Sequence, residues 1–166
     1  SSDVCSSDLL KITSNHLKMK LKDRVAIVTG GGKGIGEEIC LGLAKEGAKI
    51  VIAEIDIANS ENAKKKILDA GSEAIIVKTD VSKKDSINEM VDKAIQTFGK
   101  IDILINNAGI RHVKKLLDHT KQDWDDMISV NLTAPFLASQ AVIPHMIKNG
   151  DRKSTRLNSS HLVISY

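Results

Sequence analysis

Aromatic and sulfur-containing side chains are scarce in this sequence. Aromatic residues make up 2% of it, and the only tyrosine, Tyr166, is the last residue, so the interior has no tyrosine for acid–base chemistry. The two cysteines, Cys5 and Cys40, are too few for the disulfide framework of a small secreted domain. No unbroken apolar run is long enough to cross a membrane, and no signal peptide is visible. We therefore expect a cytoplasmic protein without a membrane partner.

A strong excess of one charge is also missing. The 24 Lys and Arg residues against 21 Asp and Glu residues leave a net charge of +3, scattered along the chain. This balance argues against a nucleic-acid partner, which needs a concentrated basic surface. Histidines, cysteines and carboxylates do not cluster at ligand spacing, so we expect no metal site.

The two ends of the sequence carry related strings. DNA encoding Ser1–Asp8 can be written so that its reverse complement, shifted by one base, encodes Asp151–Asn158. This agreement indicates translated sequencing-adapter DNA, as at the scar of an expression vector. We expect residues 1–18 to be an artefactual or upstream tail and residues 151–166 an artefactual tail. Residues 19–150 suffice for one domain with its own core, and Met19 is the expected natural start.

Between these ends, short β-branched runs alternate with longer helical stretches, each pair separated by a turn. The expected strands are Arg24–Thr29, Lys49–Glu54, Ala74–Thr79 and Ile101–Asn106, and the expected helices span 34–46, 59–70, 84–98 and 122–148. Strands so apolar suit a parallel sheet buried on both faces. The pattern predicts an α/β, doubly wound sheet in the order 3-2-1-4, with helices on both faces and a ligand crevice at the carboxyl ends of the strands. The fourth strand should be an exposed edge.

A glycine-rich turn, Thr29–Gly36, joins the first strand to the first helix. Glycine permits tight turns and close approach of a phosphate, and the following helix presents N–H groups to that anion. The position within a β–α–β unit predicts dinucleotide binding. A nucleoside-triphosphate loop would end in Lys-Ser or Lys-Thr, which is absent here. The residues predicted to bind the cofactor in this turn are Gly30, Lys33, Gly34, Ile35 and Gly36.

Two charged residues near this turn bear on the choice of cofactor. Glu54 ends the second strand, where a carboxylate can accept hydrogen bonds from both ribose hydroxyls of NAD and would repel the 2′-phosphate of NADP. Lys33 favours NADP instead, because an ammonium in the glycine turn could pair with that phosphate. A carboxylate facing the hydroxyls acts at closer range than a flexible lysine, so we predict NAD, with NADP as the alternative.

Further polar residues follow the third and fourth strands. Asp80-Val81 should lie along the adenine ring, although Asp80 is equally suited to capping the next helix. After the fourth strand, Asn107 can tie neighbouring strands through its amide, while Ala108 and Gly109 let a cofactor approach. These residues are further predicted cofactor contacts.

Asn131 is the most informative polar residue of the last helix. Pro135, four residues later, lacks the N–H that would bond the Asn131 carbonyl, which is therefore free to hold a water in a proton relay. Apolar residues at helical spacing should pack this helix on the sheet. They are Trp124, Met127, Ile128, Leu132 and Phe136.

Four motifs in this order resemble the short-chain dehydrogenase/reductase family. They are Thr29–Gly36, Asp80-Val81, Asn106–Gly109 and Ser129–Asn131, and the resemblance covers residues 21–150. It implies a Rossmann-type fold, NAD or NADP as cofactor, hydride transfer on a small alcohol or ketone, and a homo-oligomer. It also implies that Asn131 belongs to a catalytic Asn-Ser-Tyr-Lys set, whose Tyr-x-x-x-Lys pair this sequence lacks.

Two alternatives remain open. A 3-oxoacyl-carrier-protein reductase should prefer NADP and show a basic docking patch. A dinucleotide-binding module without chemistry, such as a nucleotide-sensing regulator, belongs to a different class. A Tyr-x-x-x-Lys pair in the parent protein would separate an enzyme from such a module.

Overall fold

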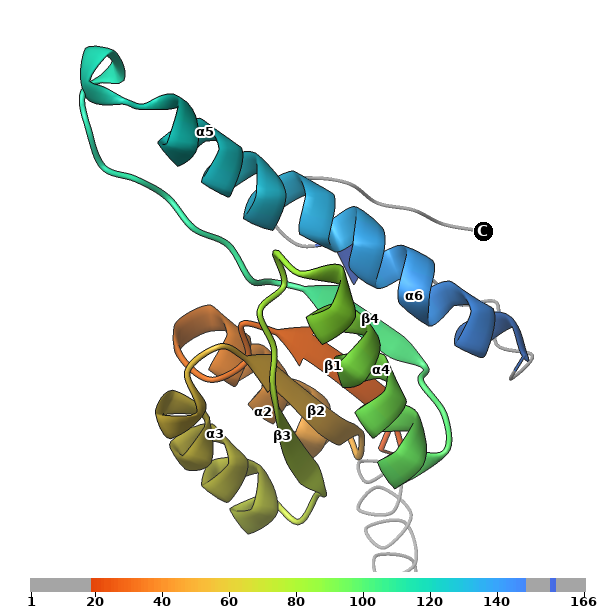
Figure 1. Cartoon of the computed structure of the whole chain (residues 1–166). Helices are drawn as coiled ribbons and strands as arrows, with labels where there is room; N and C mark the ends of the chain where they lie inside the picture. The colour runs from red at the N-terminus through yellow and green to blue at the C-terminus, as the bar shows by residue number, and fades with distance from the viewer. Residues whose placement is uncertain (1–18, 149–155, 158–166) are drawn as a thin grey trace, which may run out of the picture.

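The computed structural model describes residues 19–148 and 156–157 of the 166-residue chain (Figure 1). The predictions for the rest of the two tails, including Tyr166, lie outside the described residues. Within them, parallel strands form one sheet in the order β3-β2-β1-β4-β5. The strands are β1 Val25–Thr29, β2 Lys49–Glu54, β3 Ala74–Lys78, β4 Ile103–Asn106 and β5 Arg156–Leu157. The predicted α/β fold and the order 3-2-1-4 are confirmed.

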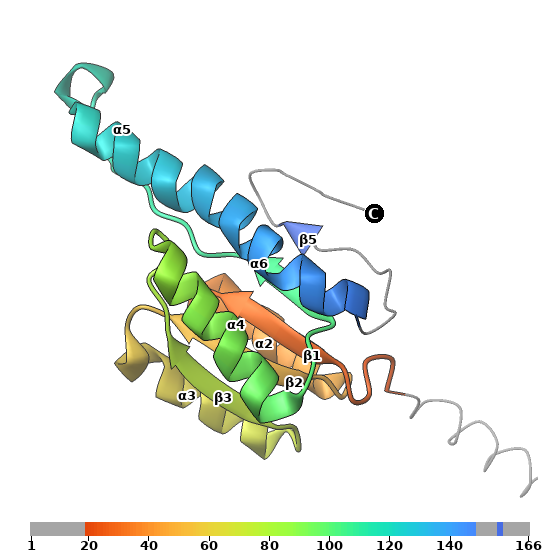
Figure 2. The same cartoon turned by 45° about the vertical axis from the view of Figure 1, so that its right-hand side comes forward.

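Helices cover both faces of this sheet (Figure 2). Contacts join α2 and α3 to one another and to β1, β2 and β3, whereas α4 contacts α6 and the opposite face. The helices are α2 Gly34–Lys45, α3 Ile57–Asp69, α4 Lys84–Phe98, α5 Lys121–Ile128 and α6 Ala134–Lys148. A 3-10 turn, η1 Leu116–Asp118, precedes α5, and a π-helical turn, η2 Ser129–Thr133, joins α5 to α6.

The two faces of β1 show why the sheet is buried on both sides. Val25 and Ile27 point into the core under α4 and α6, and Ala26 and Val28 point into the core under α2 and α3. All four are at most 1% exposed. Side chains of a strand alternate between faces, so an uninterrupted apolar run requires a layer of helices on each side.

The helix Lys121–Lys148 buries a different stripe from the one predicted. Trp124, Leu132 and Phe136 are 58%, 54% and 50% exposed, so the prediction that they pack on the sheet is wrong. The buried residues lie two positions away around the helix: Ala134, Ala138, Val142 and Met146. Small residues at four-residue spacing let α6 approach α4 and β4 closely, and this close packing outweighs the area of the larger side chains.

The same helix also corrects the expectation about membranes. By length and composition, Lys121–Lys148 could cross a membrane, although no unbroken apolar run stands out in the sequence. These criteria are weak evidence, because the core helix of a soluble protein satisfies them too. Here Ala138, Val142 and Met146 belong to the core that α6 shares with α4.

The outer edge of β4 is paired where we predicted an open edge. Ile105 and Asn106 are in parallel register with Arg156 and Leu157 of β5, which lies in the segment expected to be an artefactual tail. A strand edge presents backbone N–H and C=O groups that pair with extended backbone of almost any sequence. Pairing of this kind depends on the backbone, which is why the side-chain pattern did not reveal it.

Candidate functional site

A cavity of about 250 Å³ lies at the carboxyl ends of β1, β2, β3 and β4. Most of the predicted cofactor residues line it: Gly30, Lys33, Glu54, Asp80, Val81, Asn107, Ala108 and Gly109. Other lining residues were not predicted: Ala53, Ile55, Thr79, Ile110 and Val130. All of them except Thr79 are apolar, and these residues are recognisable as cavity lining only once the strand ends are placed together. Gly34, Ile35, Gly36 and Asn131 do not line the cavity.

The glycines of the turn serve distinct structural purposes. Gly30 has a φ of +63°, and a Cβ there would lie 2.9 Å from the Ala108 Cα. A Cβ on Gly36 would lie 2.0 Å from the Gly30 carbonyl oxygen, so only glycine lets α2 begin against the turn. Gly34 also has a positive φ, +56°, but nothing lies within 4 Å of its Cβ position. The turn is therefore tightly packed toward the protein and open at Gly34.

The first turn of α2 offers N–H groups that no capping side chain occupies. Its N-cap residue, Lys33, makes no side-chain capping bond, whereas Asp56 caps α3 and Thr120 caps α5. A helix start without a cap leaves N–H donors and the positive end of the helix dipole available to an anion. Together with the close-packed glycine turn, this arrangement fits the pyrophosphate of a dinucleotide.

Glu54 is held in place at the end of β2. It is 9% exposed, and its Oε2 accepts a hydrogen bond from the Gly32 N–H at 3.3 Å. Its Oε1 accepts from the Ile55 N–H at 3.0 Å. A Cβ on Gly32 would lie 2.9 Å from the Glu54 Cγ, so the glycine turn leaves room for this carboxylate. The charge thus has a defined position at the cavity wall.

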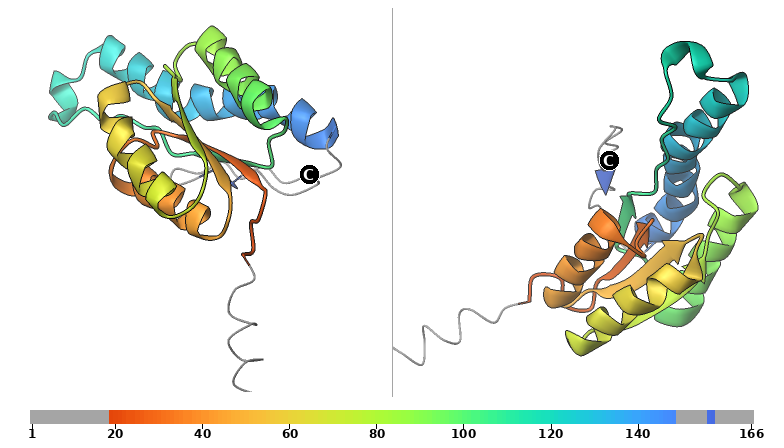
Figure 3. Two further views of the ribbon diagram at one scale, coloured as in Figure 1. Left: turned by 90° about the horizontal axis from the view of Figure 1, so that it is seen from below. Right: turned by 90° about the vertical axis from the view of Figure 1, so that its left-hand side faces the viewer.

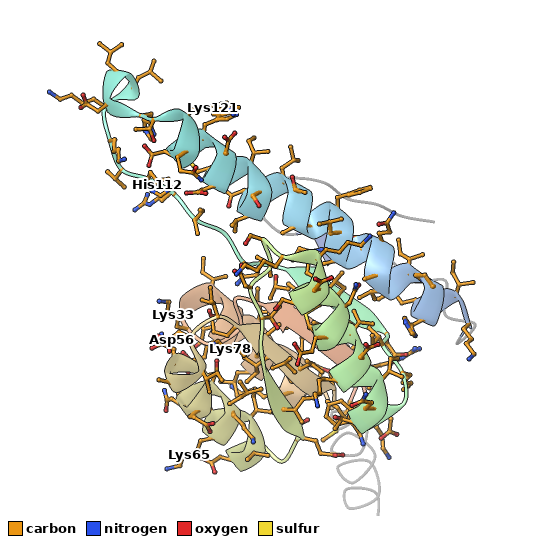
Figure 4. All side chains as sticks on the ribbon, in the orientation of Figure 1. Lys33, Asp56, Lys65, Lys78, His112 and Lys121 are labelled. Atoms are coloured by element: carbon orange, nitrogen blue, oxygen red, sulfur yellow. The ribbon has the colours of Figure 1, made fainter. Side chains whose placement is uncertain are left out.

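Two cations lie near this end of the cavity. Lys33 also lines the cavity, and Figure 4 shows it on the same flank of the molecule as Asp56. Lys78 ends β3, the strand next to β2. Lys33 forms no ion pair within the described part of the chain, so it is available to an anionic group as the NADP alternative requires.

Asp80 makes its bonds within the turn that precedes α4. Its Oδ1 accepts from the Ser82 hydroxyl at 2.6 Å and the Ser82 N–H at 3.1 Å, and Lys83 lies 3.4 Å from its Oδ2. The Ser82 hydroxyl, more than the nearby Lys83, holds the pKa of the Asp80 carboxyl below its ordinary value. These bonds close the turn ahead of α4 but do not cap the helix, whose N-cap residue is Lys83 and has no side-chain capping bond. The helix-capping alternative for Asp80 is therefore wrong, and the adenine contact stays a prediction.

Asn107 ties β4 to the glycine turn. Its Nδ2 donates to the carbonyls of Thr29 and Gly30 at 3.1 and 3.0 Å, and its N–H donates to the Thr29 Oγ1 at 3.0 Å. The Ala108 N–H donates to the same hydroxyl oxygen at 3.1 Å. These bonds fix the relative position of the two cavity walls that the glycine turn and the Asn107–Gly109 segment provide.

Asn131 lies in the π-helical turn between α5 and α6. The Ala134 N–H donates to the Ser129 carbonyl, five residues back, and Pro135 follows with no N–H of its own. The Asn131 side chain points to the neighbouring loop, where its Nδ2 donates to the Ile110 carbonyl at 2.8 Å. The Ile110 N–H donates back to its Oδ1 at 2.9 Å. No local pattern in the sequence predicts this pairing.

No group of three or more metal-ligating side chains occurs among residues 19–148 and 156–157. The site therefore consists of a glycine turn, an uncapped helix start, a buried carboxylate and an amide-anchored loop. Together with the parallel sheet, these features define a Rossmann-type dinucleotide-binding fold.

Comparisons with known proteins agree with this description. The family profile described as short chain dehydrogenase matches residues 24–156. An uncharacterized oxidoreductase of Thermotoga maritima is 39% identical over 130 residues, covering 78% of this chain and 51% of the relative. An uncharacterized oxidoreductase of Staphylococcus aureus is 37% identical over 143 residues, covering 86% and 58%.

Solved structures show the same similarity. NAD+-bound xylitol dehydrogenase matches with a TM-score of 0.77 at 31% identity, covering 83% of this chain and 52% of that one. A hydroxysteroid dehydrogenase from Escherichia coli matches with a TM-score of 0.76 at 34% identity, covering 80% and 56%. The chain belongs to the short-chain dehydrogenase/reductase family of oxidoreductases, and it spans about half the length of these relatives.

Proposed function

We propose that the whole protein is an NAD-dependent oxidoreductase that transfers hydride between the nicotinamide and a small alcohol or ketone. The observation that carries the proposal is the cavity at four strand ends, bordered by the glycine turn and by the held carboxylate of Glu54. Family membership supports the reaction class, and one structural neighbour carries NAD+ according to its description.

Each part of the cavity has a role in this proposal. The bound cofactor would supply the hydride chemistry. The N–H groups at the start of α2 would bind the pyrophosphate, with Lys33, Gly34, Ile35 and Gly36 forming that turn. Glu54 would accept hydrogen bonds from the adenosine ribose, and Asp80 and Val81 would border the adenine. Asn107, Ala108 and Gly109 would border the nicotinamide half, where the Asn131 carbonyl would hold a water for proton transfer.

NAD is favoured over NADP by the fixed position of Glu54. Its carboxylate is bonded to two backbone N–H groups, so it cannot swing away from an incoming 2′-phosphate without breaking both bonds. Lys33 is the opposing group, and its side chain is exposed and unpaired in the described part of the chain. A held charge at short range outweighs a flexible one whose interaction with a phosphate is screened by solvent.

Calorimetric titration with NAD+ and NADP+ tests this choice. We expect the unmodified protein to bind NAD+ more tightly, and Glu54→Ser to reduce the preference by about tenfold, because the repulsion is removed. Lys33→Met is the matched control and should leave the preference for NAD+ in place. Tighter binding of NADP+ that disappears in Lys33→Met would reverse the assignment and favour the 3-oxoacyl-carrier-protein reductase alternative.

We also propose that the 166-residue chain binds cofactor without turnover. The reaction needs a group that exchanges a proton with the substrate oxygen and has a pKa near the working pH. The amide of Asn131 does not titrate, and the sequence contains no Tyr-x-x-x-Lys pair. Reduction of NAD+ across a panel of alcohols should remain at background. Activity that persists through repurification would show that a different residue is the acid/base.

A further inference from the structure

The loop between β4 and α5 is held to the protein by few contacts. We call residues 110–120 the strap; it runs beside the helix toward the far end of α5, beyond the sheet (Figure 3). Val113, Leu116 and Leu117 of the strap are 82%, 86% and 96% exposed, so apolar burial does not fix its path. Polar contacts at two points along it must do so instead.

The first point is the Asn131–Ile110 pair, at the start of the strap. The second is Asp123, in the first turn of α5, which is 8% exposed. Its two carboxylate oxygens accept hydrogen bonds from the Lys114 Nζ at 2.8 and 2.7 Å. Its Oδ2 also accepts from the Thr120 N–H at 2.8 Å and the Thr120 hydroxyl at 2.9 Å. Asp123 thus joins the middle of the strap to its end.

The ion pair in this cluster is stable in its charged form. The Lys114 ammonium, more than the bonds from Thr120, holds the pKa of the Asp123 carboxyl well below its ordinary value. His112, which Figure 4 shows on the strap beside α5, lies with its Nδ1 3.9 Å from the Asp123 Oδ1. Between residues 19 and 148, no other side-chain hydrogen bond or ion pair joins residues 110–119 to the helix.

We infer that Lys114 and Asp123 are positioning residues that hold the strap so that Ile110 borders the nicotinamide half of the cavity. The inference rests on the proposed function. Ile110 lines the cavity, and only three residues separate it from Lys114. Those residues span about 10 Å when extended. Release of Lys114 therefore leaves Ile110 between the anchored Ala108 and a strap whose next contact is lost, with Asn131 as its own hydrogen-bond partner. Added motion of Ile110 disturbs the part of the cavity proposed to bind the nicotinamide. The part proposed to bind the adenosine is not disturbed, because Glu54 and Asp80 lie on other elements.

Calorimetry of NAD+ and of ADP binding to the 166-residue chain distinguishes an effect on the nicotinamide half of the cavity from an effect on the adenosine half. In Lys114→Met and in Asp123→Asn we expect the affinity for NAD+ to fall by about tenfold and the affinity for ADP to change less than twofold. Lys114→Arg should retain NAD+ affinity, because a guanidinium also donates to both carboxylate oxygens. Lys121→Met is the matched control, because it removes an exposed ion pair, between Lys121 and Asp125, on the same helix α5.

Hydrogen exchange supplies a second measurement that needs no cofactor. Amides of residues 110–115 should exchange faster in Lys114→Met, while those of β1 and β2 keep their protection. Equal loss of ADP and NAD+ affinity would mean a general structural role and overturn the inference, as would unchanged NAD+ affinity with unchanged exchange. If the unmodified chain binds neither ligand, the proposed function itself fails. If it binds both and the variants match it, only the role of Lys114 and Asp123 fails.

Discussion

Asn131 and Ile110, 21 positions apart in the sequence, exchange two hydrogen bonds: the Asn131 Nδ2 donates to the Ile110 carbonyl, and the Ile110 N–H donates to the Asn131 Oδ1. Both polar atoms of the amide side chain therefore help to hold the loop that leaves β4. Pro135 meanwhile has no N–H to offer the Asn131 carbonyl. Structural anchoring thus falls to the side chain of Asn131, and the proposed water-binding role falls to its backbone.

Substitutions of two glycines in α2 test how tightly the start of this helix packs against the glycine turn. Gly36→Ala should strongly destabilise the protein, because the new Cβ would lie 2.0 Å from the Gly30 carbonyl oxygen. Gly42→Ala, in the same helix, has no atom within 4 Å of the new Cβ and should stabilise the protein by about 0.5–1 kcal/mol. Urea denaturation of both variants measures the contrast. Similar stabilities would contradict the packing described for Gly36.

Asp102 joins the beginnings of β1 and β4. Its side chain is 3% exposed and accepts hydrogen bonds from the Arg24 Nη1 at 2.7 Å and the Val25 N–H at 2.8 Å, with Lys100 nearby. Asp102→Ala removes the acceptor of the buried Val25 N–H and the buried end of the ion pairs, and should lower the free energy of unfolding by about 3 kcal/mol. The matched control, Asp125→Ala, removes an exposed ion pair and should cost less than about 0.5 kcal/mol. Equal effects in chemical denaturation would argue against the role of Asp102.

The contribution of Asp123 to stability should depend on pH. Its folded-state pKa lies below the ordinary value of 3.8, so the ionised carboxylate stabilises the folded state fully above that value. This stabilisation is lost as the pH falls below 3.8 toward the folded-state pKa. The difference in unfolding free energy between the unmodified protein and Asp123→Asn should therefore shrink as the pH falls from 5 to 3. A difference that stays constant down to pH 3, or grows, would contradict this assignment.

Much of the fold was predictable from local patterns. The bounds of β2, Lys49–Glu54, and of α4, Lys84–Phe98, agree with those predicted, since apolar runs and the turn at Gly99 mark them. Gly99 ends α4 with a φ of +76°, a conformation that glycine adopts at little cost. The glycine turn and the order of strands also followed from the sequence, because right-handed crossovers leave few arrangements.

Other features depended on contacts between distant residues. The sequence pattern indicated one apolar stripe on the helix Lys121–Lys148, and the structure buries another, because Ala134 and Ala138 let α6 approach its neighbours closely. The pairing of Ile110 with Asn131, and of Lys114 with Asp123, likewise has no local signature. Thus the sequence by itself determined the strands, the turn and the residue types at the cavity, which depend on local backbone preference and on the alternation of apolar side chains. Only the tertiary structure decided which helix face is buried and which loop residues are clamped, because burial and hydrogen-bond geometry exist only once separate elements have packed together.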